Sequence, residues 1–119
     1  MGNKKFITKD SGKREKFTSG MQRDIQEGKP RFDLIFPKIM PYKEQCITRF
    51  AELMARGATK YDARNWEKAS GEKEMERFKA SATRHFIQWL CNEEDEDHLV
   101  ATWFNMQGYE YVKWKLKNK

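Results

Sequence analysis

The clearest chemistry in the sequence lies in a run of acidic residues towards its C-terminal end. Residues 91–112 carry six acidic side chains and no Lys or Arg, and five of these acids are consecutive at positions 93–97. Glu94 and Asp97 are three positions apart, so on a helix their carboxylates share a face and could hold a hard divalent cation such as Mg²⁺. Glu93 and Glu96 repeat this spacing. The alternative is a solvated set of acids that stabilises the start of a helix.

The same helix face continues from Asp97 through Ala101, Asn105 and Gly108. Small residues allow another helix or a ligand to approach closely, and polar groups at such an approach need partners there. A carboxylate and an amide among small residues therefore favour a binding site over plain core packing. His98 lies beside this stripe, either as a hydrogen-bonded structural residue or as a candidate base.

Two other polar sets could contact a ligand. Arg84 and His85 directly precede an apolar position, and the guanidinium could bind a phosphate or pair with the acidic run. A second set offers a cation, a hydroxyl, an amide and an indole within seven residues: Lys60, Tyr61, Asn65 and Trp66. Such a segment could stack on a base while holding a phosphate, or it could anchor a loop on the core.

Helical periodicity predicts the elements that must position these residues. Apolar residues on one helix face, with Gly57 as the stop, predict a first helix over residues 42–56. A second helix is expected from about Ser70 to about residue 91, and a third over 95–114. Glu52 lies on the polar face of the first helix, where it either pairs with Arg56 or faces the acidic run. Strand-like alternation is absent, so the predicted fold class is all-α, a small helical bundle.

Composition limits the class of protein. The chain has 119 residues and a formal net charge of +6, of which +5 belongs to residues 1–32. Residues 1–20 are poor in apolar side chains, so we expect a flexible basic arm there and a single helical domain over 21–119. The nearly neutral remainder, with its acidic cluster, argues against nucleic acid as a partner. No apolar run is long enough to span a membrane, and the protein is expected to be cytoplasmic.

An ordered series of motifs resembles the dATP/dGTP diphosphohydrolase N-terminal family, which is frequent in bacteriophages. The motifs are Ser-Gly-Met-Gln-Arg-Asp at 19–24, Gly-Lys-Pro-Arg-Phe-Asp-Leu at 28–34, Gly-Ala-Thr-Lys-Tyr at 57–61, Arg-Asn-Trp-Glu-Lys at 64–68, Arg-His at 84–85, and Asp-Glu-Asp-His-Leu at 95–99 followed by Trp103 and Asn105. The family looks related to the all-α nucleotide pyrophosphohydrolases of the MazG type. The resemblance therefore implies a MazG-like fold and metal-dependent cleavage of purine deoxynucleoside triphosphates between the α and β phosphates.

The resemblance also implies roles for individual residues. Glu94-x-x-Asp97 matches the second acidic element of those enzymes, so Glu94, Asp97 and Glu52 are the expected ligands of Mg²⁺ or Mn²⁺. Proton transfer falls to Glu93 or Glu96, with His98 as a further candidate. The expected substrate-binding residues are Lys60, Tyr61, Asn65, Trp66, Arg84, His85 and Asn105.

Two other functions stay open from the sequence. Arg49 stands three positions before Glu52, where the related enzymes carry an acid, and this departure favours a module that binds a nucleotide without cutting it. The basic arm favours a nucleic-acid-binding protein, whose affinity would fall steeply with salt. Three helices of this size rarely enclose a nucleotide alone, so a homodimer or higher oligomer is expected.

Overall fold

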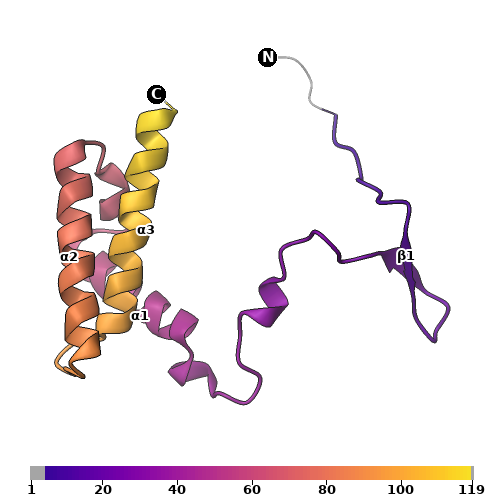
Figure 1. The fold of residues 1–119 in the computed structure, drawn as a ribbon, viewed down its shortest axis with the longest axis horizontal. Helices are drawn as coiled ribbons and strands as arrows, with labels where there is room; N and C mark the ends of the chain where they lie inside the picture. Colours follow the sequence, from indigo (N-terminus) through magenta and orange to yellow (C-terminus); the bar gives the residue numbers. More distant parts are fainter. Residues whose placement is uncertain (1–4, 119) are drawn as a thin grey trace. The chain divides into compact units, whose positions relative to one another are not determined.

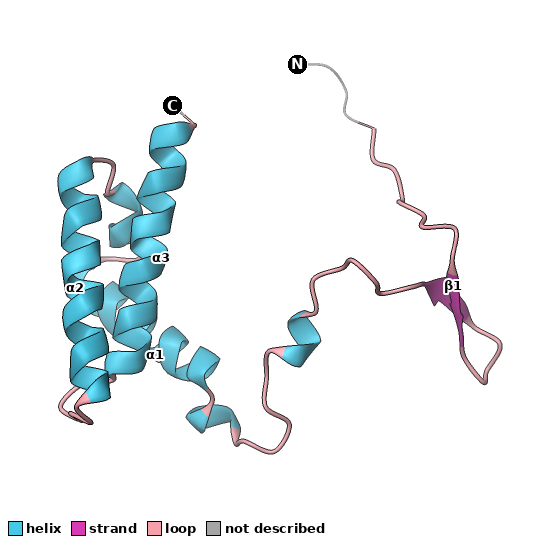
Figure 2. Cartoon of the chain, in the orientation of Figure 1, coloured by secondary structure: helices cyan, strands magenta, loops and turns pink. Residues whose placement is uncertain are grey.

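The computed structural model describes residues 5–118 and divides the chain into two compact units, one ending at Ile35 and the other beginning at Phe36. The second unit contains three α-helices, α1 (Cys46–Tyr61), α2 (Glu72–Leu90) and α3 (His98–Lys117) (Figures 1 and 2). Short 3₁₀ turns lie at Phe32–Leu34 in the first unit and at Tyr42–Glu44 and Asn65–Lys68 in the second. The predicted all-α class is confirmed. None of the described helices combines the length and apolarity needed to cross a membrane.

The first unit contains a small hairpin that the sequence patterns did not predict. Strand β1 (Arg14–Lys16) pairs antiparallel with β2 (Gln22–Asp24). Each strand has three residues, which is too short for an alternating pattern to be visible in the sequence. The turn closes with Gly20 at φ +92°, a conformation that glycine adopts without a Cβ clash. The hairpin spans position 20, and the division into an arm over 1–20 and a domain over 21–119 stays a prediction.

Helices α2 and α3 pack closely along the small-residue stripe that the sequence revealed. Ala101, Asn105 and Gly108 are all buried on α3. At Gly108 a Cβ atom would lie 2.5 Å from Cε1 of Phe78 on α2, so only glycine permits this approach. Val112 continues the face and is fully buried. The stripe is therefore core packing along most of its length.

Helix α1 differs from its prediction at both ends. A 3₁₀ turn precedes it, and the helix continues through Gly57 to Tyr61. The prediction of Gly57 as the stop is wrong because this glycine does not adopt a positive φ; Asp62, at φ +83°, ends the helix instead. Phe50 joins α1 to α3 by packing on Trp103, with ring centroids 4.2 Å apart.

Helix α3 begins three residues later than predicted. Asp97 is its N-cap, and its Oδ1 accepts a hydrogen bond from the Val100 backbone N–H at 3.5 Å. Because His98 is the first helical residue, Glu94 and Asp97 precede the helix and do not share a helix face. That part of the prediction is wrong, although both residues lie in the same loop between α2 and α3.

The 3₁₀ turn Asn65–Lys68 is held against α3 by one lysine. Nζ of Lys115 donates to the backbone carbonyls of Glu67 and Ala69, each at 2.8 Å. Trp66 of the same turn packs edge-on against Tyr111, with ring centroids 5.1 Å apart. The turn is thereby fixed beside the end of α1.

Candidate active site

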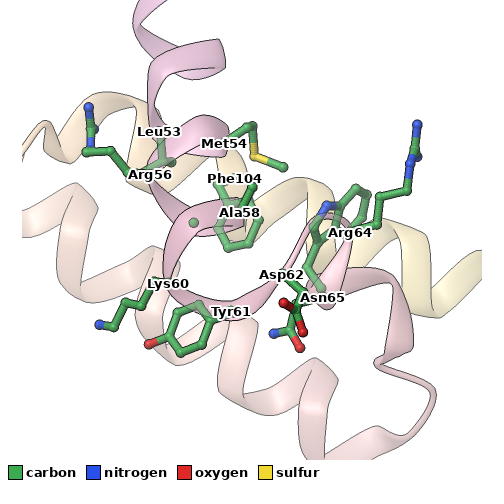
Figure 3. A pocket seen from close by; sticks show the side chains of 12 residues that line it. Leu53, Met54, Arg56, Ala58, Lys60, Tyr61, Asp62, Arg64, Asn65 and Phe104 are labelled. Carbon is green, nitrogen blue, oxygen red and sulfur yellow. The ribbon is translucent and has the colours of Figure 1, made fainter.

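An apolar cavity of about 290 Å³ lies at the C-terminal end of α1, and we call it the aromatic cavity. Rings from three elements line it: Tyr61 of α1, Trp66 of the 3₁₀ turn and Phe104 of α3. The cationic side chains of Arg56, Lys60 and Arg64 also line it, together with Leu53, Met54, Gly57, Ala58, Asp62 and Asn65 (Figure 3). An apolar cavity with a few polar groups is the usual form of a small-molecule site.

The consecutive acids at positions 93–97, here called the acidic loop, lie beside two further cavities of about 400 and 390 Å³. Glu94, Glu96 and Asp97 line both cavities, and Glu93 lines the larger one. Leu53 and Arg56 line the smaller of the two and also line the aromatic cavity. The aromatic cavity and the acidic loop therefore adjoin, with Arg56 reaching both.

Asp97 is held by Arg49 of α1. The guanidinium donates from Nε to one carboxylate oxygen and from Nη2 to the other, both at 2.7 Å. This bidentate pair holds the pKa of Asp97 below its usual range, and Arg56 adds to the effect. Both oxygens of Asp97 are therefore occupied by a cation that the chain supplies itself.

The negative charge of the acidic loop also affects the pKa of a cationic side chain on α1. The side chain of Tyr61 raises the pKa of Lys60 most strongly, and the Glu96 carboxylate raises it further. Positive groups on α1 thus lie within electrostatic range of negative groups on the loop. An anion seated between them would meet the cations, and a metal ion would meet the carboxylates.

Two buried histidines form a hydrogen-bonded chain behind the acidic loop. Nδ1 of His85 lies 2.8 Å from Nδ1 of His98, and Nε2 of His98 lies 2.7 Å from Oδ1 of Asp95. The carboxylate can only accept, so neutral His98 carries its proton on Nε2 and accepts at Nδ1 from His85. His85 Nε2 then faces an N–H of Arg84 at 3.4 Å. Burial and the nearby Arg84 charge both lower the pKa of His85, in keeping with a neutral ring.

The structure brings most of the sequence-predicted residues to these cavities. Lys60, Tyr61, Asn65 and Trp66 all line the aromatic cavity. Glu93, Glu94, Glu96, Asp97 and His98 all line the larger cavity at the acidic loop.

Four other predicted site residues lie apart from the cavities, and one of them is His85 of the histidine chain described above. Glu52 is exposed and lines none of the three cavities. Asn105 is buried, and its amide donates to the Ala101 carbonyl of its own helix at 2.7 Å. Arg84 is exposed and donates to the side chain of Gln88 at 3.2 Å.

The acidic loop has the donor chemistry for Mg²⁺ or Mn²⁺. Glu93, Glu94 and Glu96 are exposed carboxylates around one cavity, and hard divalent cations prefer carboxylate oxygens. Two sets that include His98 also bring ligand atoms within 4.8 Å of one another. Both ring nitrogens of His98 already have partners, so a metal ion bound through His98 would displace one of these hydrogen bonds. Among residues 5–118 the ligand atoms of Glu93, Glu94 and Glu96 do not all lie within 4.8 Å of one another, so an ion held by these glutamates would need their side chains to rearrange.

Sequence reasoning did not assign Arg56 or Asp62 to the site. Arg49, Leu53 and Arg56 recur at i, i+4 and i+7, a spacing that places them on one face of α1. That spacing indicates that α1 has a face with two arginines, and in the structure this face is turned towards the acidic loop. Asp62 directly follows Tyr61, the last residue of the motif at 57–61, but its positive φ is visible only in the structure.

Comparison with known proteins identifies the family of the chain. A family model described as dATP/dGTP diphosphohydrolase, N-terminal, matches residues 19–115. No curated protein and no solved structure matches the chain. The matched span covers the aromatic cavity, the acidic loop and the cations of α1. The chain therefore belongs to the dATP/dGTP diphosphohydrolase N-terminal family.

Proposed function

We propose that this chain hydrolyses purine deoxynucleoside triphosphates to the monophosphate and pyrophosphate, using a divalent metal ion. One observation carries the proposal: the aromatic cavity and the acidic loop adjoin, and Arg56 lines both. A base in the aromatic cavity would direct its phosphates past Arg56 towards the carboxylates. The family to which the chain belongs supports this reaction class.

In this reaction the carboxylates of the acidic loop would hold the metal ion and accept a proton, and the cations of α1 would stabilise the phosphates. Mg²⁺ or Mn²⁺, held by Glu94 with Glu93 or Glu96, would supply a polarising charge for the phosphates and for water. The glutamate that does not ligate accepts a proton from the water that attacks phosphorus. Arg56 and Lys60 stabilise the charge that develops as pyrophosphate leaves. Trp66 and Tyr61 hold the base by stacking and exclude water from it.

The reaction is tested by incubating the protein with each of the eight common nucleoside triphosphates and Mg²⁺ or Mn²⁺. Chromatography should show monophosphate and pyrophosphate from dATP or dGTP. Glu94→Gln should lower the rate by about 100-fold or more. Glu110→Gln is the matched control, because Glu110 is an exposed acid of α3 that lines none of the cavities at the site. Equal rates for the two variants, or no cleavage at all, would overturn the proposal.

One observation favours a second function, the binding of a nucleotide without cleavage. Arg49 occupies both oxygens of Asp97, which leaves the acidic loop with one carboxylate fewer for a metal ion. A binding module would retain dATP or dGTP in equilibrium dialysis and release it uncut. Cleavage in the assay above excludes this alternative.

The site also suggests an oligomer. Phe86, Ile87, Trp89 and Leu90 at the end of α2 are 47–56% exposed. Trp89 also lines the larger cavity at the acidic loop, so a second copy that covered this apolar end would lie beside the site. We propose a homodimer or higher oligomer, with the activity in the cytoplasm where nucleoside triphosphates are found. Light scattering at micromolar concentration tests it: Leu90→Glu should reduce the mass, and a monomeric wild type would contradict it.

A further inference from the structure

Asp62, the residue that ends α1, adopts a backbone conformation that is unfavourable for residues other than glycine. Asp62 has φ +83° and ψ 150°, a region that almost only glycine occupies. Two positions later Arg64 is left-handed, at φ +62°. This tight turn brings the chain from α1 into the 3₁₀ turn and places both Asp62 and Asn65 at the wall of the aromatic cavity (Figure 3).

Asp62 and Asn65 form a pair of exposed polar groups at the wall of the aromatic cavity, which the cationic side chains of Arg56, Lys60 and Arg64 also line. The Asn65 backbone N–H donates to the Asp62 carbonyl at 3.3 Å, which fixes the two residues relative to each other. Among residues 5–118 neither side chain makes a hydrogen bond or an ion pair. The carboxylate and the amide are therefore available to a ligand in the cavity.

The chemistry of this pair discriminates between the two purines. A carboxylate can only accept hydrogen bonds. Guanine presents two adjacent donors on its Watson–Crick edge, N1–H and the N2 amino group, whereas adenine presents an acceptor, N1, beside its amino group. An amide can both donate and accept, so the NH₂ group of Asn65 could donate to O6 or N7 of guanine. Opposite a carboxylate, guanine would donate two hydrogen bonds, whereas adenine would donate only one and would turn the lone pair of N1 towards the negative charge. The carboxylate is therefore the member of the pair that favours guanine.

We propose that Asp62 is the specificity-determining residue of the aromatic cavity and selects guanine over adenine. The inference rests on the proposed function in taking the ligand to be a purine nucleotide. This role also accounts for the strain at the end of α1. Glycine would adopt the turn without strain, but it has no side chain that could form hydrogen bonds with the edge of the base.

Binding without catalysis tests the inference directly. Equilibrium dialysis with dGTP and with dATP in EDTA, where no metal supports cleavage, should show about a ten-fold preference of the wild type for dGTP. Asp62→Asn keeps the shape of the side chain and replaces one acceptor by a donor, so this preference should be lost. A variant that keeps the ten-fold ratio, or a wild type that binds dATP as tightly as dGTP, would overturn the proposal. So would a wild type that binds neither nucleotide.

A second variant separates recognition from folding. Asp62→Gly relieves the strained φ and should raise the urea midpoint of unfolding, yet it should also lose the preference for dGTP. A glycine variant that keeps the preference would contradict the proposal regardless of its stability. The outcomes also separate this inference from the proposed reaction. Hydrolysis with an unchanged base ratio removes only the inference, whereas guanine-selective binding without hydrolysis removes only the reaction.

Discussion

Replacing Lys115 by methionine should destabilise the fold by releasing the 3₁₀ turn from α3. The lysine Nζ bridges two backbone carbonyls at 2.8 Å each, those of half-buried Glu67 and buried Ala69. Methionine keeps most of the apolar stem but leaves both carbonyls without that donor. A hydrogen bond from a charged donor contributes about 1.5–3 kcal/mol, and Lys115 is partly exposed. Because solvent reaches the ammonium, each bond should contribute less than this range, about 1 kcal/mol, and we expect a loss of about 2 kcal/mol for the two bonds together.

Urea unfolding followed by circular dichroism measures this loss. With an m-value of about 1 kcal/mol per molar urea, the midpoint should fall by about 2 M. Lys113→Met is the matched control, because Lys113 is exposed on the same helix and its substitution should leave the midpoint unchanged. Hydrogen exchange should also accelerate in residues 65–69 of Lys115→Met. Equal midpoints for the two methionine variants would refute the reasoning.

Two further predictions concern the packing and electrostatics of the helices. Gly108→Ala should cost about 1–3 kcal/mol, because its Cβ would lie 2.5 Å from the Phe78 ring. Gly57→Ala, where nothing lies within 4 Å, should stabilise by about 0.5–1 kcal/mol in the same urea assay. A double-mutant cycle with Arg49→Gln and Asp97→Asn should give a coupling of about 1 kcal/mol. Arg49 lowers the pKa of Asp97, so this stabilisation is present above the unfolded pKa of about 3.9 and is lost as the pH falls through the folded value. A coupling that did not weaken in acid would contradict the assignment.

The helices were predictable where their ends carry local signals. Helix α2 was predicted from about Ser70 to about residue 91 and runs over Glu72–Leu90. Its start carries a local signal, because Glu74 accepts hydrogen bonds from the backbone N–H groups of Ser70 and Gly71. Helix α1 was predicted to stop at Gly57, but a glycine ends a helix only where the backbone turns left-handed, and the turn occurs at Asp62. Sequence shows which residues can cap a helix, but it does not show which of them the tertiary contacts select.

The site was predictable in its residue types more than in its geometry. The acids at 93–97 and the segment 60–66 were found because their chemistry is contiguous in the sequence. The bidentate pair of Arg49 and Asp97 joins residues 48 positions apart, and a periodic pattern in the sequence does not predict a contact at that separation. The tautomers of His85 and His98 likewise depend on partners that only the fold supplies.

The single ion pair between α1 and the acidic loop explains how opposite charges can face each other without neutralising the site. Arg49 and Asp97 are the only bridge between the two elements among residues 5–118. This bridge fixes the position of α1 against the loop. Within the described part of the chain, Arg56 and Lys60 form no ion pair, and neither do the carboxylates of Glu94 and Glu96. A triphosphate with its metal ion carries both signs of charge and needs both sets. Under the proposed function, the pair of Arg49 and Asp97 is structural, and the remaining charges of α1 and the acidic loop would bind the triphosphate and its metal ion together.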